Sequence, residues 1–314
     1  MVSQRANPRT LMEAMRHFTP EVADAYVASI KWPSGPCCSA CGSTNVLYKG
    51  RVARCRERGC RKKSRLTAGT IMHDTHLRLD QWCVAVWMIV NCRNGVSSHE
   101  IHRTIGARQQ SCWHLLHRVR HILAQSTTPM MGTVEADSTL VGGLLKHMHA
   151  GRRARLTNFK GQGQRLSGKT IVHAIRERHS GHVRAHVIES ERTDVINPLI
   201  EANVRRGARI MTDASHSYRR LWRYRHEFVN HTEEEYVRGE CHVQGCENFF
   251  SNLRRSLRGT YIRATPEHLS AYVDEAVFRF NVRKKGEWER FHGAMTLILG
   301  KRLTYSELTG GAVR

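Results

Sequence analysis

Two closely spaced cysteine pairs restrict the fold of this chain more than any other feature. Cys38 and Cys41 are separated by two residues, Cys55 and Cys60 by four, and thirteen residues join the pairs. Four thiolates in two pairs, on a loop that folds back as a hairpin, supply a tetrahedral metal site. Cys37 is an alternative to Cys38, although the two-residue spacing favours Cys38. We therefore predict one structural Zn²⁺ in a zinc ribbon over residues 33–75, since four sulfur ligands leave no position open for substrate.

The other cysteines, of ten in all, are better interpreted as buried thiols than as disulfides. Residues 1–30 lack the apolar core of a signal peptide and carry scattered charges. The longest apolar run, residues 84–90, is much too short to span a bilayer. We therefore expect no membrane partner and a cytoplasmic location.

The charge balance points to a polyanionic partner. Lys and Arg number 50 against 27 Asp and Glu, which gives a formal charge of +23 spread along the whole chain. Double-stranded DNA is the polyanion that this excess favours. Arg61, Lys62 and Lys63 belong to a basic cluster on the expected ribbon and are candidates for contacts with phosphates, the alternative being a merely solvated surface.

Helical patterns surround the ribbon. Residues 1–32 have the spacing of an amphipathic helix broken near Pro20, and residues 76–125 predict a helix-turn-helix domain. In this domain Ser97 or Ser98 caps one helix, Gly106 makes the sharp turn and a second helix begins near Ala107. The polar start of the second helix has side chains that read base edges in a major groove, the candidates being Arg108, Gln109, Gln110 and Ser111. A generic helical hairpin is the alternative.

The second half of the chain predicts a domain over residues 132–285, in which strands and helices follow in a recognisable order. Strands are expected at 133–137, 170–176, 182–189, 208–213 and 227–230, with helices at 193–205 and from about 243, and a basic loop at 144–168. This order is the connectivity of a ribonuclease-H-like core, in which the first and fourth strands are neighbours. We expect a C-terminal helical tail over 286–314. The fold class is thus a multidomain α+β chain with a small zinc ribbon and helix-turn-helix, followed by an α/β ribonuclease-H-like catalytic domain with a mixed five-stranded sheet.

Three acids would meet at one edge of that sheet. Asp137 and Asp213 are expected to end adjacent strands, and Glu247 lies on the helix that would cross them. Converging carboxylates suit two Mg²⁺ or Mn²⁺ ions about 4 Å apart, the arrangement that cleaves phosphodiesters. Arg254 lies two helical turns after Glu247 and would contact a phosphate or steady the acids.

In combination these motifs resemble the insertion-sequence transposases of the DDE class that carry an N-terminal zinc ribbon and helix-turn-helix. The resemblance rests on residues 38–71, 134–143, 211–218, 247–261 and 278–281, and it covers roughly residues 35–310. It implies that Asp137, Asp213 and Glu247 are the metal ligands of a ribonuclease-H-like catalytic domain.

Two positions depart from the family pattern. The family often has Asn three residues before the third acid and Lys seven after it, where this chain has Gln244 and Arg254. Some relatives use Asn or His in place of the third acid, so that Gln244 or His242 could share the role of Glu247. Arg for Lys keeps the charge and changes the geometry.

The predicted function is therefore a transposase that binds terminal inverted repeats, hydrolyses the phosphodiester at the element ends and transfers the 3′-hydroxyl to target DNA. A homodimer or higher synaptic complex in a bacterial nucleoid is expected, because two DNA ends must be joined together. The alternatives are a catalytically weak or inactive sequence-specific DNA-binding protein derived from such an enzyme, and a ribonuclease-H-like nuclease or resolvase.

Overall fold

The computed structural model describes residues 7–123, 125, 127–142, 169–219, 221–229, 241–262 and 264–310. The chain divides into two compact units, one formed by residues 1–124 and 282–314 and the other by residues 125–281. The basic loop expected at 144–168 lies outside the described residues.

The first unit carries a small antiparallel sheet in the cysteine-rich segment. Its strands are β1 (Val46–Lys49), β2 (Val52–Cys55) and β3 (Lys63–Arg65), in the order β1-β2-β3. The β1–β2 hairpin turns at Gly50 and Arg51, both with positive φ, and pairs Val46 with Cys55. The hairpin that the cysteine spacing predicts is therefore present.

Helix α3 forms the centre of the helical part of this unit. Eleven of its thirteen residues are buried, because α1, α2, α4, α5 and α10 all pack against it. The bounds are α1 (Leu11–His17), α2 (Pro20–Lys31), α3 (Leu79–Asn91), α10 (Glu287–Met295), η6 (Thr296–Ile298) and α11 (Tyr305–Thr309). Phe291 of α10 lies 5.0 Å from the ring of Phe18 and 5.7 Å from that of Trp87. The C-terminal segment therefore completes the core of the first unit, although the sequence indicates only a tail.

A helix-turn-helix follows α3, as predicted. Helix α4 (Ser98–Ile105) begins with a reciprocal capping box between Ser97 and Glu100. Gly106 ends α4 in the left-handed conformation at φ 69°, and α5 (Gln109–Ile122) begins three residues later. Glycine suits this turn because other residues are strained at positive φ.

The second unit contains a mixed five-stranded sheet in the order β6-β5-β4-β7-β8. Its strands are β4 (Thr133–Val141), β5 (Thr170–Glu177), β6 (Val183–Ile188), β7 (Arg209–Asp213) and β8 (Arg225–Val229). The β4–β5 and β5–β6 pairs are antiparallel, whereas β4–β7 and β7–β8 are parallel. The first and fourth strands of this domain are thus neighbours, which confirms the predicted fold class.

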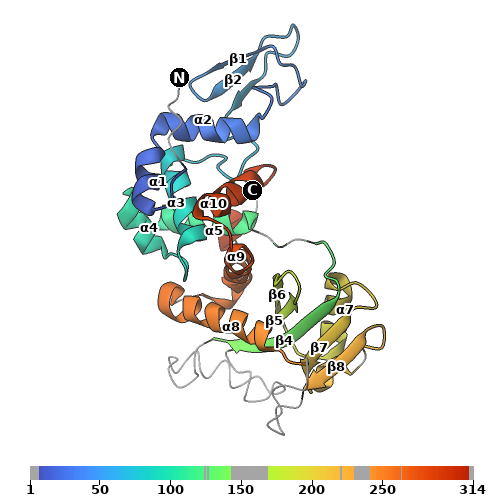
Figure 1. Ribbon diagram of the computed structural model, residues 1–314. Coiled ribbons are helices and arrows are strands. Elements are labelled where there is room, and N and C mark those ends of the chain that lie inside the picture. The colour runs from blue at the N-terminus through green and yellow to red at the C-terminus, as the bar shows by residue number, and fades with distance from the viewer. Residues whose placement is uncertain are drawn as a thin grey trace. The chain divides into compact units, whose positions relative to one another are not determined.

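Helices cover both faces of this sheet. Helix α7 (Thr193–Asn203) packs on the face of Val134, Ala136 and Ile210, while α8 (Gln244–Ser256) and α9 (Leu269–Val282) pack on the face of Val172 and Ala174. Figure 1 shows α8 lying alongside β4 and β5. Shorter elements are η2 (His216–Tyr218), η4 (Leu257–Tyr261) and η5 (Pro266–His268). Alternate residues of β4 therefore face α7 and α8 in turn.

Candidate active site and metal centre

Strand β4 places Asp137 beside Asp213 of β7. The last registered pair of these parallel strands is Glu135 with Met211, and each aspartate lies two residues further along its own strand. Because side chains alternate across a strand, the two carboxylates project from the same face of the sheet. The sequence prediction that Asp137 ends its strand is wrong, since β4 continues through pairing with β5 as far as Val141. Asp213 does end β7.

Helix α8 brings the third acid to the same face. Glu247 is the fourth residue of this helix and is exposed, whereas Phe249, Phe250 and Leu253 bury the other side of α8 against the sheet. Glu247 lies close enough to Asp137 for its charge to raise the pKa of Asp137. The structure thus brings together the three acids that the sequence selected.

The environment of Asp137 disfavours a negative charge. Burial raises its pKa to about 7, and the charges of Asp213, Glu247 and Glu191 add to the rise, opposed by the Ser138 backbone N–H that donates to its Oδ1. A cluster of like charges in a partly buried position is a place where a divalent cation relieves electrostatic repulsion. The donor set, with oxygen ligands alone, fits Mg²⁺ or Mn²⁺.

Glu191 is an acid that the sequence reasoning missed. It lies in the loop after β6, and β6 runs in the same direction as β4 because both pair antiparallel with β5. The C-terminal ends of β4 and β6 therefore lie at one edge of the sheet. The sequence could have indicated Glu191, because the predicted hairpin of β5 and β6 makes β6 run in the same direction as β4. The residues after β6, 189–191, then lie at the same end of the sheet as Asp137.

Arg254 is exposed on α8 and donates a hydrogen bond to the hydroxyl of Thr139. Thr139 follows Asp137 by two residues on the same face of β4. Gln244 is exposed at the first position of α8, and His242 places its Nδ1 3.8 Å from a carboxylate oxygen of Glu135. Arg254 therefore ties α8 to β4 beside the acids.

A closed, preformed metal shell is present only in the ribbon, as far as the described residues extend. There, the four sulfurs of Cys38, Cys41, Cys55 and Cys60 all lie within 4.8 Å of one another, and no other group of three or more potential ligands is that close. The three acids are therefore not as close to one another as the ligands of such a closed shell.

The cysteine cluster has the geometry of a zinc site. Cys38 Sγ lies 3.6 Å from Cys60 Sγ, and Cys41 Sγ lies 3.6 Å from Cys55 Sγ. Zn–S bonds of about 2.3 Å in a tetrahedron imply sulfur–sulfur distances of about 3.8 Å. Backbone N–H groups of Cys41 and Ala40 lower the pKa of Cys38 to about 6. The four cysteines can therefore bind zinc as the spacing predicted.

Some candidate DNA-binding side chains of the first unit are exposed, whereas others are hydrogen-bonded within the unit. Arg61, Lys62 and Lys63 are exposed, as are Arg108 and Ser111. The two glutamines of the second helix instead donate within the unit, Gln109 to the hydroxyl of Ser98 at 2.7 Å and Gln110 to the hydroxyl of Tyr305 at 2.6 Å. Both amides would have to exchange these partners to bind bases.

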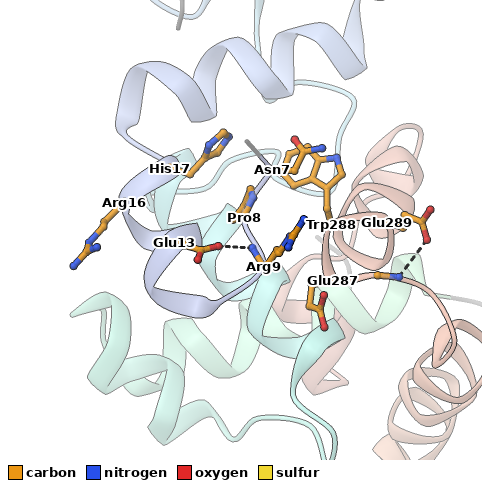
Figure 2. Close-up of a pocket in the computed structure, with 10 residues that line it drawn as sticks. Asn7, Pro8, Arg9, Glu13, Arg16, His17, Glu287, Trp288 and Glu289 are labelled. Atoms are coloured by element: carbon orange, nitrogen blue, oxygen red, sulfur yellow. Dashed lines mark hydrogen bonds between the residues drawn. The ribbon is translucent and has the colours of Figure 1, made fainter. Parts of the chain in front are cut away.

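A separate hollow of about 740 Å³ lies within the first unit (Figure 2). Figure 2 shows Arg9, Glu13 and His17 on one side and Glu287, Trp288 and Glu289 on the other. Its lining mixes both signs of charge and contains none of the predicted site residues. No helix among the described residues is long and apolar enough to cross a membrane.

Two comparisons with known proteins found similar sequences. Residues 129–281 match the family model of the ISXO2-like transposase domain. The chain is also 24% identical, over 265 residues, to an uncharacterized protein in transposable element ISH50 of Halobacterium salinarum. That match covers 81% of this chain and 90% of the relative.

Proposed function

We propose that this chain, whose residues 129–281 match the ISXO2-like transposase domain, is an insertion-sequence transposase that cleaves and joins DNA at the ends of its element. The chain binds the terminal inverted repeats and hydrolyses the phosphodiester at each end. The freed 3′-hydroxyl then attacks target DNA. Asp137, Asp213 and Glu247 hold two Mg²⁺ or Mn²⁺ ions for both steps.

The observation that carries this proposal is the meeting of the three acids on one face of the sheet. Asp137 and Asp213 project side by side from parallel strands, and the charge of Glu247 reaches Asp137. Two bound divalent cations would activate the attacking oxygen and stabilise the leaving oxygen. Arg254 is placed beside them, where its guanidinium steadies the strand–helix junction or meets a phosphate.

The first unit supplies DNA recognition in this proposal. Zn²⁺ held by Cys38, Cys41, Cys55 and Cys60 fixes the ribbon, whose exposed Arg61, Lys62 and Lys63 contact phosphates. The helix α5 enters a major groove through its first turn, where Arg108, Gln109, Gln110 and Ser111 lie. The charge of +23 supports contacts with DNA phosphates.

A homodimer or larger synaptic complex follows from the reaction, because two element ends must be brought together before they are joined. The protein then acts on the bacterial nucleoid, where its substrate lies.

A cleavage assay with matched variants tests the proposal. Labelled DNA from the flanks of the coding gene is incubated with Mg²⁺ and the wild type, Asp137→Asn, Asp213→Asn or Glu247→Gln. Glu201→Gln is the control, since Glu201 is an acid of the same unit on α7 that pairs with Arg223. We expect equal DNA binding by all proteins, cleavage by the wild type and the control, and none by the other three.

Each contrary outcome has a definite meaning. Undiminished cleavage by Glu247→Gln would move the third ligand to Gln244 or His242. Binding without cleavage by the wild type would favour a sequence-specific binding protein. Cleavage without joining would favour a nuclease of the same fold.

A further inference from the structure

The fully buried carboxylate of Glu135 joins strand β4 to the start of helix α8. Its Oε2 accepts hydrogen bonds from the backbone N–H of Gly245 at 2.8 Å and of Cys246 at 3.3 Å. Its Oε1 accepts from Arg178 Nε at 2.8 Å and Arg176 Nη1 at 3.1 Å. One carboxylate thus accepts hydrogen bonds from four donors, two on arginines at the end of β5 and two in the first turn of α8.

Helix α8 needs this carboxylate because it has no cap of its own. Its N-cap residue is Val243, which makes no side-chain cap hydrogen bond. The first N–H groups of a helix have no partner inside the helix, and a negative charge near them is stabilising. Glu135, from a strand 110 residues away, supplies what a Ser or Asp at the N-cap position usually provides.

The position of Glu135 connects this cap to the acids. Asp137 follows it by two residues on the same face of β4. On α8, Glu247 follows Gly245 by two residues. Beyond both acids, Arg254 donates to Thr139 and forms a second tie between the same strand and helix.

Gly245 shows how closely the two elements approach. A Cβ at this position would lie 2.5 Å from Glu135 Oε2 and would collide with the guanidinium of Arg176. The backbone of Gly245 has no positive φ that would itself require glycine. A side chain at position 245 would therefore have to displace the carboxylate of Glu135 or the side chain of Arg176.

We propose that Glu135 is a positioning residue that docks the first turn of α8 on β4 and so fixes the distance between Asp137 and Glu247. This inference rests on the proposed function, because it assigns Glu135 a task in the same site. Glu135 itself touches neither substrate nor metal. Its four donors use the lone pairs that a metal ligand would need.

Glu135→Gln tests the proposal, because the amide keeps the shape of the side chain while losing the charge and turning an NH₂ group toward N–H donors. In the full-length protein without added Mg²⁺, we expect amide exchange in the first turn of α8 to accelerate at least about tenfold, since hydrogen bonds to a charged group are among the strong ones. Mn²⁺ binding, measured by calorimetry, should weaken by a similar factor. Excess Mn²⁺ should then restore cleavage.

Glu275→Gln is the matched control. Glu275 is also a fully buried carboxylate, paired with Arg279 and accepting from Tyr261, in the same unit but away from the first turn of α8. Its loss should lower stability without changing exchange at Gly245 or the affinity for Mn²⁺. An equal effect of both variants on these two quantities would overturn the proposal.

A second pair of variants covers the case in which Glu135→Gln fails to fold. Gly245→Ala adds one methyl group against Glu135, whereas Gly259→Ala adds it where nothing lies within 4 Å. We expect weakened Mn²⁺ binding and faster exchange only in Gly245→Ala, and unchanged values in it would overturn the proposal. Failure of the wild type to cleave DNA would refute the proposed function instead, because the exchange and Mn²⁺ comparisons need no DNA.

Discussion

Neutralising Asp137 should stabilise the protein when no divalent cation is bound to the acids. The pKa of Asp137 is raised from 3.8 to about 7, mainly by burial and further by Asp213, Glu247 and Glu191. Between these two values the folded protein keeps a proton that the unfolded chain has lost. The free energy of unfolding of the wild type therefore falls as the pH rises from 3.8 to about 7. The variant Asp137→Asn has no carboxyl group at this position and does not lose this stability.

The size of the effect follows from the two pKa values. Each pKa unit corresponds to about 1.4 kcal/mol, so a rise from 3.8 to about 7 amounts to at most about 4 kcal/mol at pH 8. At pH 5 the loss is only about 2 kcal/mol, because the folded carboxyl is still protonated there. The advantage of Asp137→Asn should thus grow by about 2.7 kcal/mol from pH 5 to pH 8, because stability falls by about 1.4 kcal/mol per pH unit until the pH reaches the folded pKa of about 7.

Urea unfolding at the two pH values measures this difference. Pulsed hydrogen exchange, followed on a peptide from β5, reports the unfolding of the second unit alone. No chelator is needed, so that zinc stays bound in the ribbon of the first unit. Adding Mg²⁺ at pH 8 should stabilise the wild type and leave Asp137→Asn unchanged. Identical pH profiles for the two proteins would refute the reasoning.

Three further predictions concern the first unit. Replacing Cys38 and Cys41 together by Ser should lower zinc content from about one per chain to near zero and speed amide exchange in β1 and β2, without affecting β5. Gly106→Ala should destabilise the helix-turn-helix by about 1 kcal/mol because φ is 69° there, as judged by amide exchange in α4. Ile101→Ala should lower the free energy of unfolding of the first unit by about 3 kcal/mol, since Ile101 is fully buried, and urea unfolding followed by tryptophan fluorescence would check it.

The features that the sequence predicted are those with local signals. The cysteine spacing, the Ser97 cap with Gly106 as the turn, and the alternation in β5 and β6 each depend on residues close together in the chain. The order of elements then sufficed for the sheet, because few topologies satisfy the rules of strand connection. Asp137 and Asp213 could be selected from that order alone.

What the sequence could not predict depends on distant partners. The extension of β4 beyond Asp137 is stabilised by pairing with β5, and Ser138 and Thr139 carry no apolar alternation that would show it. No local pattern assigns a role to Glu135, because the helix terminus that it caps lies 110 residues away. The burial of Phe291 beside Phe18 is a long-range contact of the same kind.

Joining of a pre-cut DNA end to a target plasmid tests the central claim most directly. An end with a 3′-hydroxyl, incubated with the wild type and Mg²⁺, should yield a joined product. Asp213→Asn should bind the same DNA and join nothing, and a 3′-deoxy end should stay unjoined with the wild type. Joining by Asp213→Asn, or joining of the 3′-deoxy end, would contradict the account.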